Sequence, residues 1–125
     1  MATLVVPSPF PTAKAPRELD CRLKWQSPGN GITYDPGESF TVGWMVTNTG
    51  TAAWVPLSVD FTYVAGSKLY DDPLVHLRAG VAPGQAVVLS VAMTAPRNPT
   101  KYTTRWSLRK GDIYFCPLSL SIYVE

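Results

Sequence analysis

The segment WMVTNTGTAAW, residues 44–54, constrains the fold more than any other part of the chain. Before it, apolar side chains alternate with small or polar ones over residues 40–46, which is the period of a strand with one buried face. Asn48 and Gly50 then predict a tight turn, because both residue types tolerate a positive φ. We therefore expect a hairpin-like turn between two strands that carry one tryptophan each.

The composition is typical of one globular domain built from short strands. The chain has 125 residues, of which 46% are hydrophobic and 16% charged, so it can bury a core and is not expected to be disordered. Prolines and glycines lie between the apolar runs, as in sandwiches with many sharp turns. The basic residues form no stripe with interleaved aromatics, so no nucleic-acid partner is predicted. No apolar run approaches the ~20 residues of a membrane span.

Two regions differ in character. Residues 1–18 are predicted to be a proline-rich linker or N-terminal extension, because prolines alternate there with small residues and favour extended chain. Residues 19–125 are predicted to be the folded domain, one module of a larger protein. Residues 4–6 are apolar, and they are candidates for pairing with a strand edge of a neighbouring copy.

Alternating hydrophobicity predicts seven to nine short strands and no helix after residue 18. This pattern indicates an all-β fold, an immunoglobulin-like antiparallel β-sandwich. Large aromatic side chains on inward-facing positions are expected to dominate its core, since each buried tryptophan removes about 200 Å² from water. These predicted core residues are Trp25, Phe40, Trp44 and Trp106. Trp54 follows the turn closely and is expected to cap the sandwich or to lie partly exposed.

The motif F-x3-W-x3-N-T-G-x3-W over residues 40–54 resembles the four-tryptophan domain of the Nbr autophagy cargo receptors. Y-x3-W-x-L over residues 102–108 fits the same pattern, and the resemblance covers roughly residues 19–124. In character the chain is closest to bacterial counterparts of this domain in exported proteins. The resemblance implies an immunoglobulin-like sandwich that binds proteins, as in cargo recognition.

The two cysteines lie on the predicted first and last strands, both on inward-facing positions. Cys21 and Cys116 are therefore expected either to form a disulfide, which implies an oxidising compartment, or to be two separate buried thiols. A disulfide closing so long a loop would stabilise the fold by roughly 4–5 kcal/mol in the chain-entropy description. Two cysteines and His76 cannot complete a four-ligand zinc site, so no metal is predicted.

The sequence contains no catalytic motif. His76 is the only histidine, and it lies between apolar residues without a nucleophile elbow elsewhere in the chain. Asp71 and Asp72 form the only adjacent carboxylate pair. Calcium prefers about 6–8 oxygen ligands, and this pair alone supplies too few of them. We therefore expect a solvated loop there, and a domain without enzymatic activity or cofactor.

Three functions remain open at this point. The leading one is a protein-binding or spacer module of an exported or cell-surface protein, whose partner is a protein ligand, a neighbouring domain or a surface polymer. The alternatives are a carbohydrate-binding accessory domain and an intracellular cargo-recognition domain. The expected location is extracellular or in the cell envelope, with the cytoplasm as the alternative.

The predicted binding surface consists of outward-facing residues of the types that anchor protein interfaces. They are Met45, Trp54, Tyr63 and Tyr70. Open sandwiches also have strand edges that can pair with another chain, so self-association through these edges or through the N-terminal extension is a further expectation.

Overall fold

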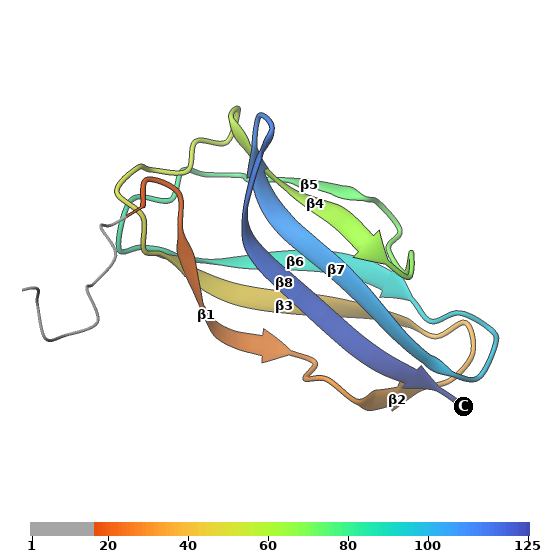
Figure 1. Ribbon diagram of the computed structural model, residues 1–125. Helices are drawn as coiled ribbons and strands as arrows, with labels where there is room; N and C mark the ends of the chain where they lie inside the picture. The colour runs from red at the N-terminus through yellow and green to blue at the C-terminus, as the bar shows by residue number, and fades with distance from the viewer. Residues whose placement is uncertain (1–16) are drawn as a thin grey trace, which may run out of the picture.

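The computed structural model describes residues 17–125, which form two β-sheets packed face to face (Figure 1). One sheet has the strand order β1-β3-β6 and the other the order β2-β8-β7-β4-β5. Neighbouring strands are antiparallel except for β2 and β8, which are parallel. The predicted all-β sandwich is confirmed. The strands are β1 (Cys21–Ser27), β2 (Ile32–Tyr34), β3 (Ser39–Asn48), β4 (Val59–Gly66), β5 (Leu74–His76), β6 (Ala86–Thr94), β7 (Lys101–Lys110) and β8 (Ile113–Val124).

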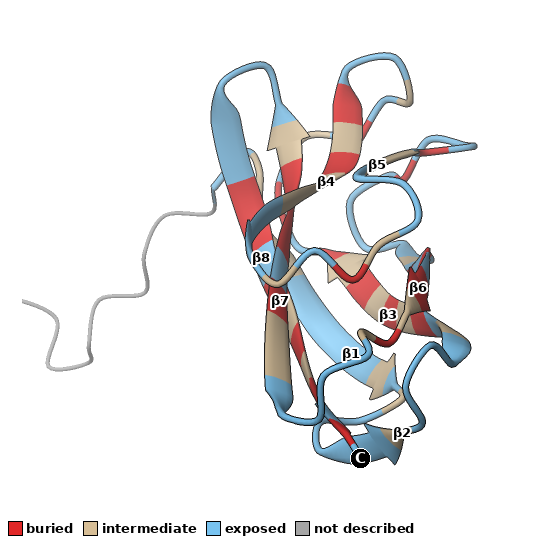
Figure 2. Cartoon of the chain, turned by 90° about the vertical axis from the view of Figure 1, so that its right-hand side faces the viewer, coloured by how far each residue is buried: buried red, intermediate tan, exposed pale blue. Residues whose placement is uncertain are grey.

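The core lies between the sheets and is centred on aromatic rings. Phe61 contacts Trp44 edge to face at 5.5 Å between ring centroids, and it stacks on Trp106 at 5.2 Å. Buried residues alternate along the facing strands (Figure 2), as the period-2 pattern requires. Phe40 lies at the margin of this core, where its ring stacks on Tyr34 at 4.2 Å.

Trp25 differs from its prediction as a core residue. The pairing of β1 with β3 shifts by one residue between Leu23 and Trp25, which is a β-bulge. The extra residue reverses the side-chain parity, so Trp25 pairs with Met45 on the outer face and remains 45% exposed. Gln26 turns inward instead, and its Oε1 accepts a hydrogen bond of 2.9 Å from Nε1 of Trp44.

Trp54 also differs from its prediction, because it is fully buried. The segment after the turn is not a second hairpin strand. A single antiparallel bridge holds it, with hydrogen bonds of 2.9 and 3.0 Å between the backbones of Trp54 and Val81. The indole packs against Phe115 at 5.8 Å, and its N–H has no hydrogen-bond partner among the described residues. Trp54 is therefore part of the core and not of a binding surface.

The turn after β3 is held by a buried amide. Nδ2 of Asn48 donates to the carbonyls of Ala52 and Val81 at 3.0 and 2.9 Å, while its Oδ1 accepts from the N–H of Gly50 at 2.9 Å. Neither Asn48 nor Gly50 has a positive φ. Glycine is required here because a Cβ at position 50 would lie 2.3 Å from the carbonyl oxygen of Glu18. The turn thus anchors the residues that precede β1.

A disulfide joins Cys21 on β1 to Cys116 on β8, with the Cα atoms 5.4 Å apart. Because these strands belong to different sheets, the bond links the two layers at one edge of the sandwich. Of the two alternatives that the sequence left open, the structure has the disulfide. Apart from Arg17 and Glu18, the predicted linker and its apolar residues 4–6 lie outside the described residues.

Candidate interaction surfaces

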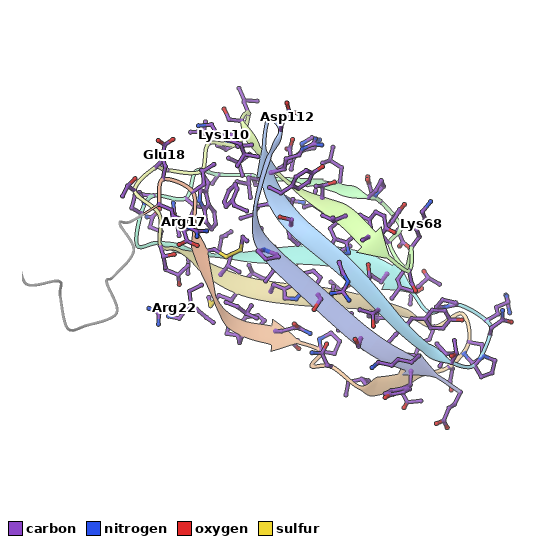
Figure 3. All side chains as sticks on the ribbon, viewed as in Figure 1. Arg17, Glu18, Arg22, Lys68, Lys110 and Asp112 are labelled. Carbon is purple, nitrogen blue, oxygen red and sulfur yellow. A yellow bond between two sulfur atoms is a disulfide. The ribbon has the colours of Figure 1, made fainter. Side chains whose placement is uncertain are left out.

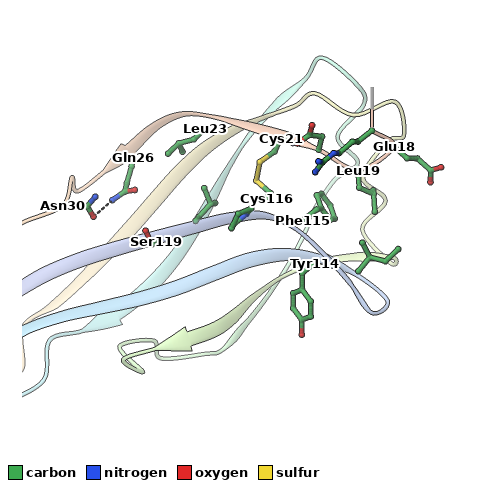
Figure 4. A pocket seen from close by; sticks show the side chains of 15 residues that line it. Glu18, Leu19, Cys21, Leu23, Gln26, Asn30, Tyr114, Phe115, Cys116 and Ser119 are labelled. Atoms are coloured by element: carbon green, nitrogen blue, oxygen red, sulfur yellow. Dashed lines mark hydrogen bonds between the residues drawn. A yellow bond between two sulfur atoms is a disulfide. The ribbon is translucent and has the colours of Figure 1, made fainter. Parts of the chain in front are cut away.

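An open groove of about 860 Å³ lies between β1 and β8 (Figure 4). One wall comes from β1 and the residues before it, including Leu19 and Leu23, and the other comes from residues 113–119 of β8. The disulfide bridges the two walls. At the far end of β1, Nε2 of Gln26 donates to Oδ1 of Asn30 at 3.3 Å, which ties this end of the groove together.

The groove exists because two strand edges remain unpaired. β1 pairs only with β3, and β8 pairs with β2 only over residues 122–124. The free edge of β1 and the free edge of residues 113–119 therefore face each other from different sheets. Pro117 removes one backbone donor from the β8 edge, a feature that limits uncontrolled strand pairing. The remaining edge groups are available to hydrogen-bond an extended chain.

The groove carries apolar side chains that are accessible to solvent. Leu23, Ile113 and Tyr114 are 43%, 58% and 55% exposed. The groove is also lined by one cationic and two anionic residues, Arg17, Glu18 and Asp20, of which Arg17 and Glu18 lie at one end of the molecule (Figure 3). An extended apolar segment with mixed charge fits these walls better than a strongly charged ligand does, because charges of both signs lie at the mouth.

The four predicted surface residues do not form one surface. Trp54 is buried, and Met45 lies half-buried on the outer face of the three-stranded sheet. Tyr63 and Tyr70 contact each other at 5.0 Å, and both rings meet Trp106 edge to face at the margin of the core. These two tyrosines are thus packed largely against their neighbours, as cross-strand aromatic pairs commonly are.

An exposed apolar row crosses the outer face of the three-stranded sheet. Trp25 pairs with Met45, and Met45 pairs with Val88 on β6. Trp25 and Val88 are 45% and 42% exposed. The indole leans over Gly43, since a Cβ there would lie 3.7 Å from Cζ3 of Trp25. Sequence alternation predicted that Met45 faces outward but missed Trp25, because the bulge in β1 leaves no signal in the hydrophobic pattern. Leu23 precedes the bulge, and it is exposed because it lines the open groove.

The polar residues weighed for chemistry have ordinary structural partners. Nδ1 of His76 lies 2.9 Å from Oδ1 of Asp60 on an exposed part of the surface. Asp71 accepts a hydrogen bond from Thr94 at 3.1 Å, and Asp72 accepts one from the backbone after it. Residues 17–125 contain no cluster of three or more metal-ligating side chains. Within the same range, no helix has the length and apolarity that crossing a membrane requires.

Two sheets of mainly antiparallel strands packed in this arrangement define the class of immunoglobulin-like β-sandwich domains. The family model described as the Ig-like domain from next to BRCA1 gene matches residues 28–124, so the chain belongs to this family. The resemblance inferred from residues 40–54 is confirmed.

Relatives and solved structures agree with this assignment. The chain is similar to Protein ILRUN from Danio rerio, with 32% identity over 98 residues, 74% of this chain and 34% of that protein. It is also similar to Protein JOKA2 from Solanum tuberosum, with 33% identity over 86 residues, 66% of this chain and 10% of that protein. The chain thus spans about a third or less of the length of these relatives.

Two solved structures share the fold. The CARDB domain of PF1109 from Pyrococcus furiosus has a TM-score of 0.55 and 13% identity, and the match covers 86% of this chain and 94% of that one. The ASH/PapD-like domain of human CEP192 has a TM-score of 0.51 and 13% identity, with 100% and 96% covered. At such identities the likeness shows the architecture alone.

Proposed function

We propose that this domain is a non-catalytic protein-interaction module of a larger protein, and that it binds an extended segment of a partner in the groove between β1 and β8. One observation carries the proposal: two unpaired strand edges face each other across an open groove of about 860 Å³. In this mode of recognition, free backbone groups of an edge give affinity, and apolar pockets give specificity. Leu23 and Ile113 are the apolar side chains placed to provide that specificity.

A peptide-display selection tests this function. The wild-type domain is used as bait for a random peptide library, and selected peptides are then measured against Leu23→Lys and Ile113→Lys. We expect at least a tenfold loss of affinity in both variants. Leu57→Lys is the matched control, because Leu57 is 99% exposed and does not line the groove. Selection of no peptide would favour a spacer, and an equal loss in the control would reject the groove as the site.

The disulfide supports a finer proposal about location. Disulfides form and persist mainly in oxidising compartments, so we place the domain in an exported or cell-surface protein. The alternative is intracellular cargo recognition. The measurement is acid lysis of cells that contain the natural protein, then alkylation under denaturing conditions without reductant and a count of modified thiols. We expect no modified thiol, and alkylation of both Cys21 and Cys116 would favour the intracellular alternative.

A second candidate function is favoured by the exposed indole of Trp25. Flat aromatic rings at protein surfaces present an apolar face with a polar N–H at the edge, and a sugar ring could stack on such a face. The other three tryptophans are at most 1% exposed, so fluorescence quenching by an added ligand would report Trp25. Quenching of tryptophan fluorescence by neutral polysaccharides, absent in Trp25→Phe, would support carbohydrate binding. Unchanged fluorescence of the wild-type domain would reject carbohydrate binding, and peptide binding would then be the remaining proposal.

A further inference from the structure

A second, smaller hollow of about 280 Å³ lies on the outer face of the five-stranded sheet. It sits over β7 and β8, and it adjoins the groove described above, because Tyr114, Pro117, Leu118 and Ser119 line both. Its walls are Val64, Tyr114 and Pro117, with Arg105 at the rim. Val64 faces outward because the pairing of β4 with β7 shifts by one residue next to it, which is another β-bulge.

The hollow fits an apolar side chain. Val64 and Tyr114 are 48% and 55% exposed, so their apolar surface is accessible to a ligand. The polar group on the floor is already satisfied, since the hydroxyl of Ser107 donates to the carbonyl of Phe115 at 2.7 Å. A ligand group therefore needs no hydrogen bond at the floor, and burying apolar surface is the available source of affinity there.

One cationic side chain, Arg105, lines the hollow, and two more lie on the same face of its strand. Lys101, Arg105 and Arg109 share one face of β7, because they are spaced by four residues on a strand. The only salt bridge within residues 17–125 joins His76 to Asp60, so no described carboxylate lies within 4.0 Å of either guanidinium. Asp60 is opposite Arg109 in the strand pairing, but it is engaged by His76. Arg105 and Arg109 thus present positive charge beside the apolar hollow, and Asp60 faces Arg109 across the strand pair.

We propose that this face binds an acidic peptide segment, with one aliphatic side chain in the hollow and flanking carboxylates on Arg105 and Arg109. Guanidinium groups bind carboxylates through paired hydrogen bonds, which fixes the orientation of the ligand as well as its charge. A nucleic acid is the less suitable partner, because Tyr114 is the only aromatic ring at the hollow that is open to base stacking. This surface shares residues of β8 with the groove, but Arg105 and Val64 line the hollow alone, and the proposed ligand differs in charge.

Fluorescence polarisation with labelled heptapeptides tests this inference. The probe has a central leucine with three glutamates on each side. One comparison peptide replaces the glutamates by lysines, and another replaces the leucine by glycine. We expect the probe to bind, to weaken as salt is added, and to bind better than both comparison peptides. Arg105→Glu should weaken it by about fivefold or more, because one exposed ion pair becomes a repulsion.

Arg97→Glu is the matched control, since Arg97 is also exposed but lies in the loop between β6 and β7. It makes the same change in net charge and should leave the affinity unchanged. Absence of probe binding, an equal loss in both variants, or tighter binding of a single-stranded oligonucleotide would overturn the proposal. The groove is tested separately, because Arg105→Glu leaves Leu23 and Ile113 in place.

Discussion

Replacing Asn48 by aspartate alters the fold at its most constrained buried polar group. The side chain keeps its size and its acceptor for the N–H of Gly50, but it loses the NH₂ that donates to the carbonyls of Ala52 and Val81. Asn48 is completely buried, so water cannot replace the lost donors. The substitution therefore removes two hydrogen bonds and introduces a buried carboxyl, with almost no change in packing.

The magnitude follows from those two bonds. The Val81 carbonyl keeps the N–H of Trp54 as a donor, and the Ala52 carbonyl is only partly buried. Each lost hydrogen bond is therefore worth about 0.5–1.5 kcal/mol, so Asn48→Asp should lower the free energy of unfolding by at least about 1–3 kcal/mol at pH 7. Burial also disfavours the charged form of the new carboxyl, which raises its pKa above that of the unfolded chain. The variant is then most stable, relative to wild type, at acid pH, and it loses stability as the pH rises through the raised pKa.

Urea unfolding followed by tryptophan fluorescence measures this difference. The control is Asn98→Asp, in the exposed loop between β6 and β7. We expect the control to match wild type within about 0.5 kcal/mol. An Asn48→Asp variant within about 1 kcal/mol of wild type, or one that becomes less stable at acid pH relative to wild type, would refute the reasoning.

Three further predictions concern stability. Replacing Cys21 and Cys116 by alanine should lower the free energy of unfolding by about 4–5 kcal/mol, because the loop of 95 residues is no longer closed. A decrease of less than about 2 kcal/mol, measured by urea unfolding, would contradict this. Burial, and then the charge of Glu38, raise the pKa of Tyr34 above that of the unfolded chain. The free energy of unfolding of wild type should therefore fall above about pH 10, and that of Tyr34→Phe should fall less steeply. Parallel pH curves for the two proteins would contradict this. Trp54→Ala should lower the free energy of unfolding by about 3–5 kcal/mol, and Trp25→Ala should lower it by less than about 1 kcal/mol. The reverse order would contradict a buried Trp54 and an exposed Trp25.

Most of the strands could be predicted because each buries one face. In β3 the alternation over residues 40–46 matches the buried positions, and β6 and β7 follow the same rule. The bulges in β1 and β4 could not be predicted, because one extra residue reverses the parity without changing the composition. Trp25 and Val64 are exposed for this reason.

The candidate sites depend on tertiary pairing, which local patterns do not contain. The groove arises because β1 and β8 join different sheets, so that their edges stay free. Trp54 is buried because its backbone bridges Val81, which is distant in the sequence. Tyr63 and Tyr70 pack on each other for a similar reason. The disulfide could be proposed because the chain has two cysteines, both on inward-facing positions of the predicted first and last strands.

Titration of a display-selected peptide into the isotope-labelled domain, followed by backbone amide chemical shifts, tests most directly whether the groove is the interaction site. We predict shifts concentrated in Leu19, Leu23, Gln26 and residues 113–119, which line the groove. The outer-face residues Gly43 and Val88 should not respond. Shifts confined to that outer face, or to the loops away from β1 and β8, would contradict the proposed function.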